Sequence, residues 1–141
     1  RKMNIEPRVA LLSYSNFGST EGSTPRKMRE ALRLIRIQDP TLKVDGEMQA
    51  NFAVDNVLLG EQFPFSDLVG KGPNVFIFPG LSSANISYKL LQSMAGMEAV
   101  GPLLVGLEYP AHVLQLGCSV REIVNTAAMA VIDAQSREVA G

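Results

Sequence analysis

The fold of this chain is decided by residues 74–92, which read NVFIFPGLSSANISYKLLQ. The apolar run VFIF predicts a strand, and the Pro-Gly pair after it ends that strand. A loop of small residues follows, and then a helix whose first turns carry Asn85, Tyr88 and Lys89. These three residues share one helix face because they are spaced i, i+3 and i+4. A strand, a tight loop and a helix N-terminus present backbone N–H groups to anions in α/β proteins, so this stretch predicts an anion-binding site.

A second candidate segment follows the apolar run at residues 9–12, a pattern typical of a strand buried on both faces of a parallel sheet. The next seven residues, 13–19, read SYSNFGS and are rich in hydroxyl and small side chains. Such a loop can hold an anion with its N–H groups and serine hydroxyls, and a surface turn is the alternative explanation. The candidate ligand contacts in this loop are Ser13, Ser15, Asn16, Gly18 and Ser19.

An amphipathic helix is predicted from Thr24-Pro25 to just before Pro40. A hydroxyl suits the N-cap and a proline suits the first helical position. Apolar residues then recur at i, i+3, i+4 and i+7 from Met28. The opposite face carries Arg26, Lys27, Arg29, Arg33 and Arg36. We interpret this face as solvated, because nearby acidic residues dilute its field.

Residues 43–49, KVDGEMQ, predict a second strand that contains two carboxylates, Asp45 and Glu47. In a regular strand two residues this far apart project to the same side. Such a pair can act as acid and base or bind a cation, but we favour a structural role near the strand end. Residues 50–59 predict a helix, and residues 60–73 a connecting loop.

The C-terminal part predicts two more strands, at residues 103–107 and 111–114, on either side of Tyr109-Pro110. His112 is the only histidine of the chain, and a structural role is favoured for it over catalysis. In the preceding helix the spacing of Ile86, Leu90 and Met94 predicts a buried stripe.

The last helix is predicted to begin with a capping box, in which Ser119 is the N-cap and Glu122 lies three residues later. That gives Glu122 a structural explanation before any catalytic one. Residues 123–132 are apolar nearly all round, which predicts burial in this domain or against a partner subunit.

The alternation of predicted strands and helices indicates an α/β fold with a mainly parallel sheet. A length of 141 residues, of which 46% are hydrophobic, predicts one globular domain. The formal net charge of −1 favours neither nucleic acid nor an anionic membrane as a partner. Cys118 is the only cysteine, which suits a reducing cytoplasm and leaves no Cys/His metal site. The opening Arg-Lys-Met indicates a piece of a longer polypeptide.

Five segments, in this order, resemble the C-terminal part of the phosphate acetyl/butyryltransferase family. They are RVALLSYSNFGS, KVDGEMQ, NVFIFPGLSSANISYKLLQ, GPLLVGL and GCSVREIVNTAAMAVIDAQ. The GEMQ and IVNTAAMAVIDAQ segments are similar to the phosphotransacetylase-like C-terminal domain of bacterial multidomain NADP-dependent malic enzymes. The resemblance implies a three-layer αβα sandwich, with residues 1–141 forming the C-terminal part of that domain.

In the transferases that this family name describes, the thiolate of CoA attacks acetyl phosphate, a Ser-Arg pair binds the reacting groups, and an Asp is the proposed base. The matching positions in this chain are Gln115, Leu116 and Glu122. A leucine in place of the arginine deletes a bidentate phosphate fork and its charge. We therefore expect no catalytic residues in this segment, and we add Gln115 to the candidate ligand contacts.

The resemblance implies a regulatory domain that binds acetyl-CoA or acetyl phosphate as an allosteric effector of a malic enzyme. It also implies a homo-oligomer, a dimer or higher. NADP and a divalent metal, Mg²⁺ or Mn²⁺, are expected in the malic enzyme part outside these residues. Two alternatives stay open: an active phosphate acetyltransferase, and a purely structural oligomerisation domain.

Overall fold

The computed structural model of the protein describes residues 5–138, which divide into two compact units. Residues 6–88 form the first unit, and the second includes residues 89–138. The boundary falls within helix α4 (Leu81–Met94), between Tyr88 and Lys89. None of the helices in the described part of the chain is both long and apolar enough to cross a membrane.

The first unit is built on a three-stranded parallel sheet in the order β2-β1-β3. Strand β1 (Arg8–Leu12) lies in the centre, with β2 (Lys43–Met48) on one side and β3 (Val75–Ile77) on the other. Val9 aligns with Val44 and with Val75 in the two ladders. All three strands are confirmed at the places that the sequence predicts.

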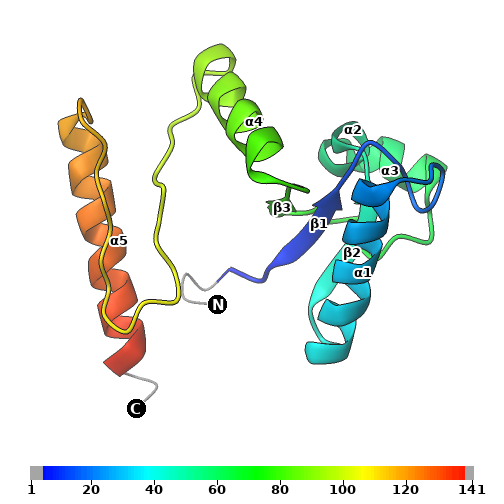
Figure 1. Ribbon diagram of the computed structural model, residues 1–141, viewed down its shortest axis with the longest axis horizontal. Coiled ribbons are helices and arrows are strands. Elements are labelled where there is room, and N and C mark those ends of the chain that lie inside the picture. Colours follow the sequence, from blue (N-terminus) through cyan, green and yellow to red (C-terminus); the bar gives the residue numbers. More distant parts are fainter. Residues whose placement is uncertain (1–4, 139–141) are drawn as a thin grey trace. The chain divides into compact units, whose positions relative to one another are not determined.

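Helices cover both faces of this sheet, which produces the three layers of an αβα sandwich (Figure 1). Helix α1 (Ser23–Gln38) packs with Met28 and Leu32 against Val9, Leu11 and Val44. On the opposite face, α2 (Ala50–Val54) and α3 (Asn56–Gln62) pack around the alternate residues of the strands. That second cluster consists of Ala10, Leu12, Met48, Ala53, Leu59 and Leu68. Alternate residues of β1 therefore enter two separate cores, as the period of a strand requires.

Two helix boundaries differ from the sequence prediction. Gly22, not Thr24, is the N-cap of α1, because its carbonyl accepts the first helical bond from the Arg26 N–H at 3.2 Å. The single helix predicted over residues 50–59 is two helices. Asp55 separates them, since its carboxylate accepts hydrogen bonds from the N–H groups of Val57 and Leu58 and so caps α3.

The second unit contains an irregular stretch over residues 95–119, followed by α5 (Val120–Glu138). The strands predicted at residues 103–107 and 111–114 are wrong, because no described segment pairs with either of them. An apolar run becomes a strand only when a partner satisfies its N–H and C=O groups. The capping box of α5 is confirmed: the Glu122 carboxylate accepts from the Ser119 N–H at 2.6 Å, and Ser119 Oγ accepts from the Glu122 N–H at 3.2 Å.

The apolar faces of α4 and α5 are exposed in this chain. The buried stripe predicted on α4 is therefore wrong: Ile86, Leu90 and Met94 are 60%, 52% and 82% exposed. On α5, whose side chains are described as far as residue 136, Thr126 is the buried residue, and Ile123 and Val124 are exposed. Periodicity reports that a face is apolar, but it does not report what covers that face. Burial of α5 against a partner subunit stays a prediction.

Candidate functional site

The three parallel strands of the first unit end at a common edge of the sheet, their carboxyl edge. Strand β1 lies in the centre of this sheet, between β2 and β3 (Figure 1). In open parallel sheets ligands bind outside the carboxyl ends of the strands. The loop after β1 and the turn from β3 to α4 begin there side by side, since Leu11 aligns with Ile77.

The loop after β1, which we define as residues 13–20, closes around the carboxylate of Glu47. Oε1 of this residue accepts hydrogen bonds from Ser15 Oγ at 2.9 Å, the Gly18 N–H at 2.9 Å and Arg29 Nη1 at 3.0 Å. The main-chain carbonyl of Glu47 accepts from the Phe17 N–H at 2.7 Å. The Glu47 side chain is fully buried, and its Oε2 has no hydrogen-bond partner among the described residues.

The remaining polar groups of the loop also bind one another. Ser15 Oγ accepts from the Thr20 N–H at 3.0 Å, and Ser19 Oγ accepts from the Asn16 N–H at 2.9 Å. Ser13 Oγ accepts from the Ser15 N–H at 3.4 Å. The structure thus brings all five loop candidates into one turn. The inward-facing donors of that turn hold the chain's own carboxylate.

Glu47 and Arg29 are the residues of this site that the sequence prediction missed. The interpretation of the basic α1 face as solvated is wrong for Arg29, which is partly buried, whereas Lys27 and Arg36 are exposed but also contact other elements. Arg29 pairs with Glu47, Arg36 bridges Asp45 and Asp67, and Lys27 donates to the Pro79 carbonyl at 2.6 Å. A usable signal was present, because a carboxylate inside a buried strand requires a nearby cation or several donors.

The two carboxylates of β2 join separate networks. Glu47 holds the loop, whereas Asp45 accepts from the Asp67 N–H at 3.1 Å and pairs with Arg36 at 3.3 Å. Each is therefore explained by partners from other elements. The preference for a structural role over an acid–base pair agrees with these contacts.

On α4, the candidates Asn85, Tyr88 and Lys89 lie on the surface of the helix. Asn85 and Tyr88 belong to the first unit, and Lys89 and Gln115 to the second. Gln115 is exposed, and its carbonyl accepts from the Cys118 N–H at 3.2 Å. The first N–H groups of α4, beginning at Leu81, have no acceptor within the helix, which makes this end of the helix favourable for an anion.

A polar groove of about 280 Å³ opens at the start of α5 in the second unit. Its lining residues are Gln92, Met97, Glu98, Ala99, Ser119, Arg121, Glu122 and Asn125. Hydrogen bonds from the N–H and hydroxyl of Ser119, with a smaller contribution from the Lys89 ammonium, lower the pKa of Glu122 below its ordinary value. Glu122 is therefore an ionised carboxylate at neutral pH that faces a solvent-filled groove.

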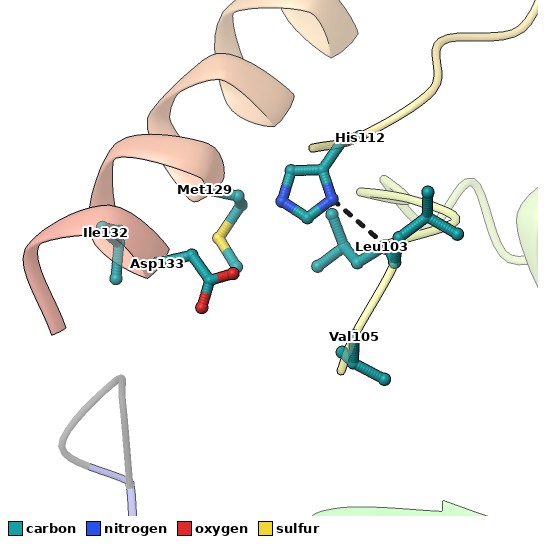
Figure 2. A pocket seen from close by; sticks show the side chains of 7 residues that line it. Leu103, Val105, His112, Met129, Ile132 and Asp133 are labelled. Atoms are coloured by element: carbon teal, nitrogen blue, oxygen red, sulfur yellow. Dashed lines mark hydrogen bonds between the residues drawn. The ribbon is translucent and has the colours of Figure 1, made fainter. Parts of the chain in front are cut away.

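An apolar pocket of about 330 Å³ lies further along α5, and Figure 2 shows its residues. Leu103, Val105 and His112 come from the irregular stretch, whereas Met129 and Asp133 come from the helix. His112 Nδ1 accepts the Leu104 N–H at 3.3 Å, drawn as the dashed line in Figure 2. This bond ties two parts of the irregular stretch together and supports the structural role favoured for His112.

Comparison with known proteins identifies the family. The phosphate acetyl/butaryl transferase family matches residues 1–131 of the chain. The chain belongs to this family. A crystal structure of a phosphotransacetylase from Streptococcus pyogenes superposes with a TM-score of 0.88 at 34% identity, covering 96% of this chain and 41% of that one. The α/β sandwich is thus shared with solved phosphotransacetylases.

Relatives of two kinds match this family member. A phosphate acetyltransferase from Paracoccus denitrificans is 50% identical over 124 residues, which are 88% of this chain and 39% of that protein. The NADP-dependent malic enzyme of Escherichia coli K12 is 45% identical over 138 residues, which are 97% of this chain and 18% of that protein. The chain therefore spans well under half the length of either relative.

The resemblance places the Ser-Arg pair of the transferases at Gln115 and Leu116. Gln115 and Leu116 are both exposed, and Leu116 is fully so. Neither side chain carries a positive charge or the planar donor fork with which arginine binds phosphate. Arg121 is nearby in sequence, but it forms an ion pair with Glu98.

Proposed function

We propose that this chain is a regulatory, non-catalytic phosphotransacetylase-like segment of an NADP-dependent malic enzyme. Its ligand is acetyl-CoA or acetyl phosphate. The observation that carries the proposal is the exposed Gln115-Leu116 pair, at the positions where the resemblance puts the Ser-Arg pair of the transferases. Without an arginine the developing charge on phosphate and carbonyl oxygens has no stabilising partner at that position, so acyl transfer loses orders of magnitude in rate.

The features that would bind a ligand remain without that arginine. The α4 N-terminus begins at the carboxyl edge of the sheet, and Lys27 lies against the turn that precedes it. Helix N-termini and ammonium groups attract the phosphate groups of acetyl phosphate and CoA. A segment with these features and no arginine fork suits a receptor site better than an active site.

Regulation requires that the ligand bind two states of the whole enzyme with different affinity. In this proposal the malate-oxidising site, its NADP and its Mg²⁺ or Mn²⁺ lie in other parts of the polypeptide. The enzyme works in the cytoplasm as a homo-oligomer, and the exposed apolar residues of α5 support a subunit or domain contact.

The test is malate oxidation by the full-length protein, followed as NADPH formation with and without acetyl-CoA or acetyl phosphate. We expect either ligand to change the malate saturation curve, and the variant Lys89→Ala to weaken that effect. Malate turnover that is indifferent to both ligands would refute the proposal.

An active phosphate acetyltransferase is the second candidate, because the Paracoccus denitrificans relative carries that name and Glu122 is an ionised carboxylate at the position of the proposed base. A direct assay separates the two functions. Acetyl phosphate formed from acetyl-CoA and phosphate at rates typical of enzymes, above about 1 s⁻¹, would establish the transferase.

A further inference from the structure

We propose that Glu47 is a positioning residue, an internal anion that fixes the shape of the loop at residues 13–20 and thereby sets which loop atoms meet the ligand. The identity of the ligand in this inference rests on the proposed function, but the role of Glu47 in fixing the loop does not. It changes the role of the loop from an anion cradle to a rigid wall of the site.

The first step is the number of contacts that one residue makes to the loop. The Glu47 carboxylate accepts from Ser15 Oγ and the Gly18 N–H, and its carbonyl accepts from the Phe17 N–H. The base of the loop is held next to it, because the Ser13 N–H donates to the Met48 carbonyl at 2.8 Å. The start and the middle of the loop are thus attached to the end of β2.

The second step is the backbone of the loop. Phe17 and Gly18 have φ angles of 46° and 87°, both in the left-handed region, where a residue other than glycine is uncommon. Concave turns of this kind direct successive N–H groups toward one anion. Here both acceptors belong to Glu47: the Gly18 N–H donates to its carboxylate and the Phe17 N–H to its carbonyl. The Phe17 ring is fixed as well, since it packs against Phe63 and Phe65 at centroid distances of 4.8 and 5.0 Å.

The third step is charge. Arg29 Nη1 lies 3.0 Å from the Glu47 carboxylate, and Arg29 Nη2 lies 3.4 Å from the Glu21 carboxylate. A buried ion pair often adds little net stability compared with apolar residues of the same volume, so stability alone is a weak reason for its presence. The geometric effect of the ion pair is specific, because Glu47 Oε1 on β2 binds both Arg29 of α1 and the loop.

The fourth step identifies the atoms left for the ligand. Asn16 Oδ1 accepts from the Gln49 N–H at 2.7 Å, which orients the amide so that its NH₂ group is the free end. No residue in the described part of the chain accepts a hydrogen bond from that NH₂ group. The N–H groups of residues 15–20 all donate to acceptors of the chain itself, so none of them remains for a phosphate. The loop would therefore meet the ligand with the Asn16 amide and not with a backbone cradle.

The test compares Glu47→Gln with Asp45→Asn in the full-length protein. Both substitutions neutralise a buried β2 carboxylate that is paired with one α1 arginine, but only Glu47 holds the loop. We expect Glu47→Gln to raise amide exchange over residues 13–20 by about ten-fold, because a charge-assisted acceptor is lost, and Asp45→Asn to leave it unchanged. We expect the Kd for acetyl-CoA to rise about ten-fold in Glu47→Gln only, because a loop that is no longer fixed misplaces its contact with the ligand.

Equal exchange in the two variants, or unchanged affinity in a Glu47→Gln protein whose loop exchanges faster, would overturn the positioning role. If Glu47→Gln does not fold, Ser15→Ala removes one of the same hydrogen bonds and the same comparison is made with it. Absence of binding by the wild-type protein would refute the proposed function instead. Hydrogen exchange alone would then decide whether Glu47 fixes the loop.

Discussion

Arg29 and Glu47 form an ion pair in which one partner is fully buried and the other only partly: the Nη1–Oε1 distance is 3.0 Å, and their side chains are 32% and 0% exposed. The pair connects α1 to the end of β2, at the edge of the sheet where α/β proteins bind ligands. The second carboxylate oxygen has no partner in the described part of the chain, so Arg29 is the counter-ion on which Glu47 depends.

We expect Arg29→Met to lower the free energy of unfolding by about 3 kcal/mol, because it leaves a buried carboxylate without its counter-ion. Arg33→Met is the matched control on the same helix. Arg33 pairs with Glu30 on the surface at 2.7 Å, and an exposed pair of this kind contributes little to stability because solvent screens it. Urea denaturation of both variants measures the difference, and equal losses would contradict this account of Glu47.

Gly46→Ala should be strongly destabilising. A Cβ built at Gly46 would lie 2.6 Å from the backbone oxygen of Leu11, and the φ of +139° is one that L side chains rarely adopt. We expect a loss of more than about 2 kcal/mol in urea denaturation, from strain and the displaced strand.

Gly60→Ala provides the control for that substitution. Its Cβ would meet only Val69, at an ordinary 3.5 Å, within helix α3. Alanine is a better helix former than glycine, so this variant should be neutral or up to about 1 kcal/mol more stable. A Gly46→Ala protein as stable as Gly60→Ala would show that β2 can shift away from β1 at this point.

Replacing Gln115 and Leu116 together, as Gln115→Ser with Leu116→Arg, should create transferase activity if the rest of the site is complete. A single well-placed group of this type is worth about 10² to 10³ in rate. Acetyl phosphate formation by the full-length double variant measures the gain, with Gln115→Ser and Leu116→Ala as the control. No increase over that control would show that the lost chemistry lies in further groups.

The start of α5 should weaken in acid. Because the pKa of Glu122 is lowered in the folded state below its ordinary 4.5, the contribution of its ionised form to stability is fully present above that value. It is lost as the pH falls through the folded pKa. Carbon-13 NMR of the Glu122 carboxyl should titrate below 4.5, and Glu122→Gln should remove this part of the pH dependence. A titration at or above 4.5 would contradict the capping geometry.

The sequence was sufficient to predict elements whose signals are local. The apolar run at residues 9–12 and the stripe of α1 from Met28 predict β1 and α1 correctly, because each pattern matches the period of its element. The capping box of Ser119 and Glu122 is equally local and is confirmed. The family resemblance supplied the three-layer fold.

The incorrect predictions concern contacts between distant segments. Residues 103–107 have the composition of a strand, but a strand also needs a partner, which composition does not supply. The pairing of Arg29 with Glu47 required the loop, α1 and β2 to converge, and a helical wheel of α1 alone places Arg29 with its solvated neighbours. The prediction of a buried stripe on α4 was wrong for the same reason.

The order of the sheet has a consequence for how the chain is made. The central strand β1 is synthesised first, yet its partner β3 follows far behind: the Arg8 N–H bonds the Asn74 side chain across 66 residues. At translation rates of roughly 5–20 residues per second, the ribosome needs several seconds to supply that edge. During this interval one edge of β1 has no partner strand. A nascent chain that stops before residue 75 would therefore expose a hydrophobic strand edge of the kind that chaperones and other unfolded chains bind.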